Sequence, residues 1–163
     1  MRTLLTTLFP AAFLLGSMAA VADSTCPRTV VPQRAASHPL SPNWYGSDAL
    51  SALLPPDGVW PTTAPGALIA GKLFWRSANF RPGMETNLHV TVKELTGAPV
   101  TARVSRPTNA NAESLGGWTM LTGIDFPKPG CFEITGKYLG QELKFVVETV
   151  QSEAYSSSRR ASN

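Results

Sequence analysis

Two cysteines are the side chains with the greatest capacity for chemistry, and the chain contains only Cys26 and Cys131. A thiol becomes a nucleophile or redox group when it belongs to a C-x-x-C pair or when neighbouring charges lower its pKa. Neither pattern surrounds these cysteines. The two histidines, His38 and His89, lie far apart in the sequence. We therefore predict a structural disulfide between Cys26 and Cys131, which leaves no Cys/His set for zinc and no metal site.

The N-terminal segment predicts the compartment in which such a bridge forms. Arg2 precedes an apolar run over residues 4–21, and Ala20 and Ala22 occupy the −3 and −1 positions of an A-x-A cleavage site. The run is short for a membrane span, and Thr, Pro and Gly interrupt it. We expect a signal peptide over residues 1–22 and no membrane span after its removal. Export to the periplasm or the extracellular medium would let a disulfide persist.

Recognisable catalytic and cofactor-binding motifs are missing from the sequence. It contains no G-x-S-x-G, H-E-x-x-H or S-x-x-K motif and no glycine-rich phosphate loop. Carboxylates such as Asp125, Glu133 and Glu142 carry no signal of pairing, so we assign them to the surface. The 14 basic and 11 acidic residues are scattered, without the basic stripe typical of nucleic-acid binding. We predict no enzymatic activity, no cofactor and no nucleic-acid partner.

The elements that must position the cysteines alternate between apolar and polar residues with the period of two that β-strands have. This pattern covers residues 88–94, 100–105, 118–126 and 131–147, while residues 71–80 are apolar on both faces, as in a more central strand. Frequent turns and the absence of a helical period after the signal peptide predict an all-β, immunoglobulin-like two-sheet sandwich. We expect a short turn at 96–99 to join two of these strands, and a polar loop at 106–117.

The last hairpin determines where the second thiol lies. Phe132 and Ile134 share one face of its first strand, and Cys131 falls on the opposite face. After a turn at Leu139–Gln141, the second strand again directs alternate apolar residues inward. We therefore expect the bridge to pin the Pro-rich N-terminal arm across the outside of the sandwich. The disulfide of an antibody domain, in contrast, joins two sheets through the core.

Four tryptophans are the remaining candidates for a binding surface or for the core. Trp118 shares the inward parity of Met120 and Ile124, and we predict that it belongs to the core. Large aromatic side chains are usually buried, and an exposed one marks a binding surface. The candidate binding surface comprises Tyr45, Trp60, Trp75 and Arg76.

Four segments give the chain a family resemblance. They are Cys26-Pro27, the Trp-x-Gly…Leu-Pro-Pro-Asp-Gly-Val stretch over residues 44–59, Trp75-Arg76, and the hairpin segment over residues 127–136. With these segments the chain resembles a loose family of exported, mostly uncharacterised bacterial proteins with an immunoglobulin-like domain. The family favours Trp at Phe132 and often has two Trp where this chain has Trp75 alone. The resemblance implies export and the sandwich fold, and it assigns no catalytic or ligand residue.

These patterns divide the chain into four parts. They are a signal peptide (1–22), a Pro-rich extended arm with short strands (23–66), the core of the sandwich (67–150) and a disordered tail (151–163). We expect an exported, non-catalytic structural or interaction module of the bacterial envelope or secretome, whose partner is another envelope protein or a glycan. Two alternatives stay open. One is a carbohydrate-binding module that uses exposed aromatics, and the other is an inhibitor of a secreted hydrolase that acts through a protruding loop.

Overall fold

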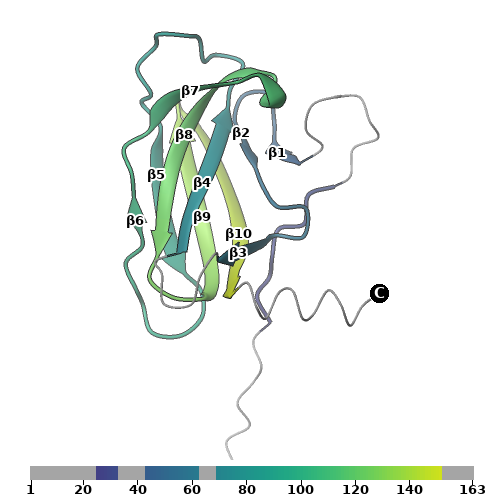
Figure 1. Cartoon of the computed structure of the whole chain (residues 1–163), viewed down its shortest axis with the longest axis vertical. Helices are drawn as coiled ribbons and strands as arrows, with labels where there is room; N and C mark the ends of the chain where they lie inside the picture. Colours follow the sequence, from purple (N-terminus) through teal and green to yellow (C-terminus); the bar gives the residue numbers. More distant parts are fainter. Residues whose placement is uncertain (1–24, 33–42, 63–68, 152–163) are drawn as a thin grey trace, which may run out of the picture.

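The computed structural model describes residues 25–32, 43–62 and 69–151 of the chain, and Figure 1 shows their arrangement. The predicted signal peptide and residues 152–163 of the predicted tail lie outside the described residues. The described secondary structure is β1 (Trp44–Gly46), β2 (Ser51–Leu53), β3 (Val59–Thr62), β4 (Ile69–Arg76), β5 (His89–Glu94), β6 (Arg103–Val104), β7 (Thr108–Ala112), the 3-10 helix η1 (Glu113–Leu115), β8 (Gly117–Phe126), β9 (Gly130–Tyr138) and β10 (Gln141–Gln151).

The strands form two sheets that pack face to face (Figure 1). The six-stranded sheet has the order β1-β2-β4-β8-β6, and β7 pairs with β8 beyond this path. The four-stranded sheet has the order β3-β10-β9-β5. All pairings are antiparallel except that of β3 with β10, which is parallel. The predicted all-β two-sheet sandwich is confirmed.

The core between the sheets is built around Trp75 from the six-stranded sheet. Its indole N–H donates a hydrogen bond of 3.0 Å to Thr122 Oγ1 on the neighbouring strand, so the buried ring nitrogen is satisfied. Room for the ring comes from Gly136 of the opposite sheet, where an added Cβ would lie 2.3 Å from the indole. Toward the other end of these strands, Phe126 of the six-stranded sheet and Phe132 of the four-stranded sheet meet with ring centroids 4.8 Å apart. Both sheets thus supply large inward side chains that interlock.

The structure corrects the prediction for residues 88–117. The strands before and after the turn at 96–99 lie in different sheets, because β5 pairs with β9 whereas β6 pairs with β8. Alternation of apolar and polar residues records which face is buried but not which strand lies alongside. The predicted polar loop at 106–117 contains β7, which pairs with β8, and the helix η1.

Residues 43–62 belong to the sandwich, contrary to the predicted boundary between an arm and a core at residues 66 and 67. They supply β1 and β2 to the six-stranded sheet and β3 to the four-stranded sheet. The apolar residues Leu50, Ala52 and Leu54 are buried there. Ala52 lies opposite Trp75 in the register of β2 and β4, so this segment is required to complete the core.

Candidate functional site

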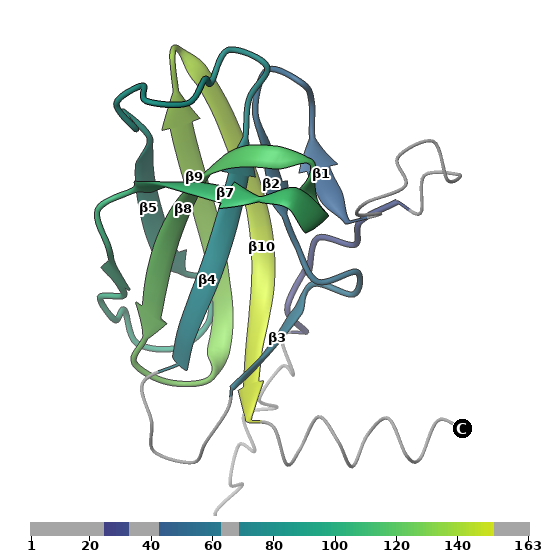
Figure 2. The same ribbon diagram turned by 45° about the horizontal axis from the view of Figure 1, so that its top comes forward.

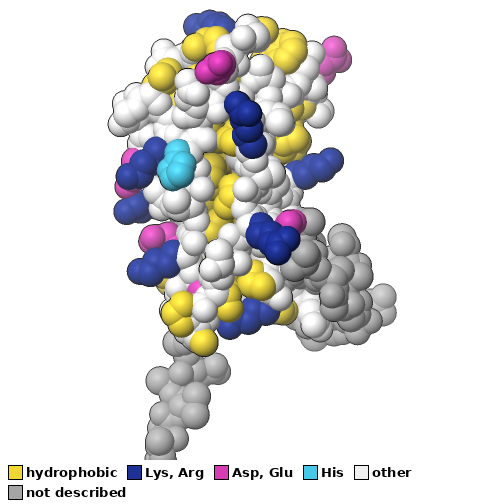
Figure 3. Space-filling view, turned by 90° about the vertical axis from the view of Figure 1, so that its left-hand side faces the viewer, with side chains coloured by type: hydrophobic (Ala, Val, Ile, Leu, Met, Phe, Trp, Pro, Cys, Tyr) yellow, Lys and Arg dark blue, Asp and Glu magenta, His cyan; other side chains and the backbone are white. Residues whose placement is uncertain are grey.

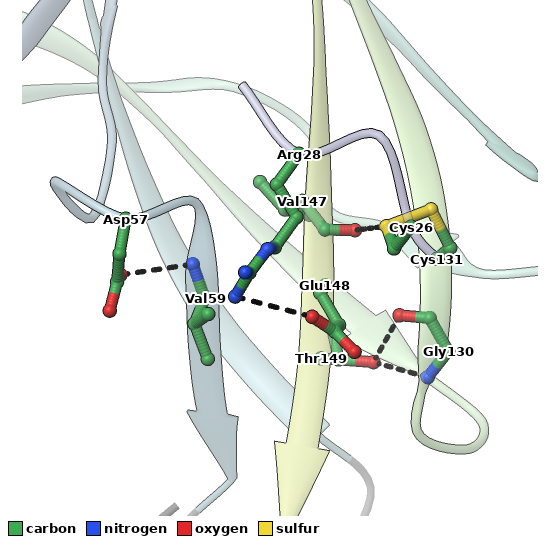
Figure 4. A network of polar contacts seen from close by, with 9 residues as sticks. All are labelled: Cys26, Arg28, Asp57, Val59, Gly130, Cys131, Val147, Glu148 and Thr149. Carbon is green, nitrogen blue, oxygen red and sulfur yellow. Dashed lines mark hydrogen bonds and ion pairs between the residues drawn. A yellow bond between two sulfur atoms is a disulfide. The ribbon is translucent and has the colours of Figure 1, made fainter. Parts of the chain in front are cut away.

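The disulfide between Cys26 and Cys131 is present, with the two Cα atoms 5.5 Å apart (Figure 4). In the register of β9 and β10, Cys131 lies opposite Glu148, while Phe132 lies opposite the buried Val147. The alternation of side chains therefore places Cys131 on the outer face of the four-stranded sheet. The predicted pairing and the predicted outer position are both confirmed.

The residues that follow Cys26 lie along β10, and we call residues 25–32 the sealing segment. The backbone N–H of Thr29 donates to the carbonyl of Val146 at 2.9 Å, and the Val146 N–H donates back to Thr29 Oγ1 at 2.9 Å. Arg28 and Glu148 form an ion pair of 3.4 Å (Figure 4). The sealing segment thus satisfies backbone groups of β10 that β3 does not reach, and the disulfide has a structural role.

The predicted aromatic surface is not formed, because its three rings turn toward the core. Trp75 is completely buried, which corrects its assignment to a binding surface. Trp60 packs edge-on against Phe126 with centroids 5.8 Å apart, and Tyr45 packs edge-on against Phe145 at 6.4 Å. Both are partly buried and contact the core cluster.

The prediction for Trp118 is also wrong, because 44% of this residue is exposed. Trp118 has the same parity as the buried Met120, which lies opposite Trp75 at the last paired position of β4 and β8. Trp118 therefore extends beyond β4, and its described strand partner is Asn111 on β7. The parity of a residue gives the direction of its side chain but does not show where the neighbouring strand of the same sheet ends.

Three connections meet at the end of the sandwich that carries Trp118, and we call them the loop end. They are residues 77–88, residues 113–118 and the turn Leu139–Gly140, all in the upper part of Figure 1 and turned forward in Figure 2. Ring centroids of Phe80 and Tyr138 lie 6.4 Å apart and tie the first connection to the end of β9.

The loop end carries three large exposed apolar side chains from three different connections. Leu139 is 55% exposed, Trp118 is 44% exposed and Met84 is 38% exposed. The side-chain amide of Asn109 donates to the Met84 carbonyl at 3.2 Å, which ties the first connection to β7. Arg76, the remaining member of the predicted surface, is partly exposed beside residues 113–118, since its Nη1 lies 3.6 Å from the position of a Cβ on Gly116.

Titratable groups elsewhere serve structural contacts. At the opposite end of the sandwich, the Glu94 carboxylate is paired with Lys128 Nζ at 2.9 Å, and the Glu94 side chain is 2% exposed. Hydrogen bonds from Lys137 and then Lys144 lower the pKa of Glu142, and burial raises the pKa of Tyr138. Within the described ranges, no three His, Cys, Asp or Glu side chains gather to hold a metal ion.

Two further findings concern the chain as a whole. In the parts of the chain that the structure describes, no helix reaches the length and hydropathy of a membrane span. Comparison of the chain with protein-family models, with curated proteins and with solved structures finds no match.

Proposed function

We propose that the chain is a non-catalytic interaction module that binds a protein partner through the loop end. The observation that carries this proposal is the 44% exposure of Trp118 on an otherwise well-buried fold. Exposed aromatic residues cluster where proteins bind each other, and Trp and Arg contribute most of the binding energy at such interfaces. Trp118, together with Met84, Leu139 and Arg76 at the same end of the sandwich, provides that combination on a scaffold of rigid strands.

The side chains around Trp118 favour a protein partner over a glycan. A sugar-binding surface stacks rings on planar aromatic side chains, and the large exposed neighbours at the loop end, Met84 and Leu139, are aliphatic. The flexible thioether of Met adapts to varied apolar partners. An inhibitor of a secreted hydrolase would be one form of such a protein-binding module.

The strand order supports an immunoglobulin-like sandwich as part of the proposal. In immunoglobulin domains one sheet has the order A-B-E-D and the other contains C, F and G. Here the orders β2-β4-β8-β6 and β10-β9-β5 match these when β2 is taken as strand A and β10 as strand G. The B–C and F–G connections, which bind antigen in variable domains, then correspond to residues 77–88 and 139–140 of the loop end.

Export and membership of the exported bacterial family stay part of the same proposal. The disulfide supports an oxidising compartment, because such bridges are rare in the cytosol. Two of the segments that carry the family resemblance have structural roles. Cys26 belongs to the sealing segment, and the hairpin after Pro127 forms the last strand pair.

Site-specific photo-crosslinking in the source cell tests the proposed surface. A benzophenone amino acid is introduced at position 118, at position 139 or at position 30. Val30 is the matched control, since it is apolar and 66% exposed but lies in the sealing segment. We expect one protein adduct of the same mass from positions 118 and 139, none from position 30, and loss of the adduct from position 139 on Trp118→Ala.

Two results would contradict the proposal. One is equal labelling from all three positions, which indicates random collision. The other is binding of the purified protein to polysaccharide that Trp118→Ala abolishes, which indicates a glycan-binding module instead.

A further inference from the structure

The strand β5 forms one edge of the four-stranded sheet, and β3 forms the other. Among the described strands, β9 alone pairs with β5. Figure 3 faces this edge and shows a strip of apolar side chains running down its middle, with Lys and Arg side chains on both sides. A regular strand with unpaired backbone groups is a template on which another extended chain can pair.

The register identifies the backbone groups that point away from β9. Leu95 N–H donates to the Cys131 carbonyl at 2.8 Å, which continues the pairing of β5 with β9. In an antiparallel pair, both backbone groups of alternate residues point toward the partner strand, so Thr91 and Lys93 also face β9. The N–H and C=O groups of the intervening residues Val90, Val92 and Glu94 therefore face the open edge.

The inner side of this edge is apolar. Val90 and Val92 on β5, together with Val100, Ala102 and Val104 leading into and through β6, contact the core cluster at the margin of the sandwich. Apart from Val90, all are only partly buried. An added strand would extend the four-stranded sheet and lay alternate side chains over this strip, so every second residue of a partner should be apolar.

The outer side of the same edge is basic. His89 and Lys93 project from β5 into solvent on the outer face of the four-stranded sheet. Arg103 of β6 is exposed on the outer face of the other sheet, across the apolar strip. Neither Lys93 nor Arg103 forms an ion pair with any described residue. In the register, Lys93 lies directly opposite Glu133 on β9, and Arg103 lies directly opposite Asp125 on β8. Neither opposed pair closes to an ion pair, so Lys93 stays available to a carboxylate on its other side.

We propose that the β5 edge accepts an extended segment of a partner protein in which apolar residues alternate with acidic ones. The segment adds as a fifth strand beside Val90–Glu94, with its apolar residues over the strip and its carboxylates on the outer face of the four-stranded sheet, beside Lys93. A second copy of this chain fits less well, because a facing β5 would place Lys93 opposite His89 or Thr91 and bring both copies' basic residues together. Lys93 thus opposes self-association and attracts an acidic strand. This surface is separate from the loop end.

Peptide binding to the oxidised, isotope-labelled protein tests the proposal by amide hydrogen exchange in NMR. The probe is a capped peptide of about eight residues that alternates Val and Glu. We expect it to slow exchange at the Val90, Val92 and Glu94 amides and to change little at Thr91 and Lys93, which already donate to β9. One control peptide alternates Val and Lys, and another has the probe's composition in two blocks; neither should protect these amides.

Charge reversal supplies the matched variants. Lys93→Glu should weaken binding of the probe about tenfold at low salt. Lys72→Glu, which reverses an exposed and unpaired lysine on the other sheet, should leave it unchanged. Equal weakening by both variants, protection only near Trp118, or no protection at about 1 mM peptide overturns the proposal, as does self-association through β5 seen by sedimentation.

Discussion

The β10 side and the β5 side of the four-stranded sheet differ in how their backbone groups are satisfied. Along β10, the parallel strand β3 and the sealing segment together satisfy the outer backbone groups, and a disulfide holds the sealing segment in place. Along β5, the backbone is open and exposed basic side chains guard it. A closed edge is stable but cannot bind a further strand. An open edge guarded by charge stays available to a partner of complementary charge.

Removing the disulfide should have the largest effect, because it loosens the covered β10 side and leaves the β5 side unchanged. The bridge joins residues 105 positions apart, and the chain-entropy model gives about 4.7 kcal/mol for a loop of about 100 residues, as an upper guide. We expect Cys26→Ser/Cys131→Ser to lose a large part of that free energy of unfolding, measured by urea denaturation. The amide hydrogen of Val146 should then exchange faster with solvent. The amides of β5 that face β9 should still exchange only when the whole domain unfolds. Unchanged exchange at Val146 would show that the sealing segment docks without its covalent tie.

A smaller effect is expected from Thr29→Ala on the closed edge. This change removes the hydroxyl that accepts the Val146 N–H at 2.9 Å, and a buried donor left unsatisfied costs about 1–3 kcal/mol. On the β5 edge, Lys93→Glu removes no ion pair but places a carboxylate opposite Glu133, so it should lower the free energy of unfolding by no more than about 1 kcal/mol. Urea denaturation of both variants measures the difference. Equal losses of unfolding free energy would show that Thr29 and Lys93 contribute equally to stability, contrary to this expectation.

The turn between β9 and β10 provides a stabilising variant that touches neither edge. Tyr138 pairs with Gln141, so Leu139 and Gly140 form a two-residue turn with φ of 46° and 77°. Such turns favour Asn-Gly because Asn tolerates positive φ better than Leu does. We expect Leu139→Asn to raise the free energy of unfolding by about 0.5–1 kcal/mol in thermal or urea denaturation. A loss instead would mean that the exposed Leu139 side chain makes a stabilising contact within the monomer.

The smallest expected effect is the acid dependence contributed by Glu142. Its pKa is lowered below the ordinary value by Lys137 at 2.8 Å and Lys144 at 3.2 Å. A depressed carboxyl pKa adds stability above the unfolded value near 4.5, and this stability is lost as pH falls through the lower folded value. Glu142→Gln should therefore unfold slightly more easily at pH 6, and the difference should vanish once the pH falls below the lowered pKa of Glu142 in the folded protein. A difference that persists in acid would assign the effect to something other than the ion pairs.

The last hairpin could be predicted from the sequence because its alternation reports burial on both strands. Phe132 and Ile134 face the core, and the parity of Cys131 also gave the outer position of the bridge. Which strands pair with each other could not be predicted in the same way. Residues 100–105 carry the pattern of a strand, but pairing with β8 rather than β5 depends on contacts with residues distant in the sequence.

The candidate surface was harder to predict than the fold. Trp75 is buried because Gly136, on a strand of the other sheet, leaves space for its ring. Trp118 is exposed because the neighbouring strand β4 ends at Arg76. Neither cause is local in sequence, although Gly116-Gly117 directly before Trp118 is a signal that a regular strand begins there rather than continues.

The position of the bridge also determines when folding can finish. Cys26 leaves the ribosome 105 residues ahead of its partner, a delay of roughly 5–20 s at 5–20 residues per second. The strand on which the sealing segment docks, β10, is the last strand that the structure describes. During that interval the first thiol has no native partner and the sealing segment has no strand to join. For several seconds, a cysteine of another protein could therefore form a non-native disulfide with Cys26. In an oxidising compartment, disulfide exchange would be needed to release Cys26 again.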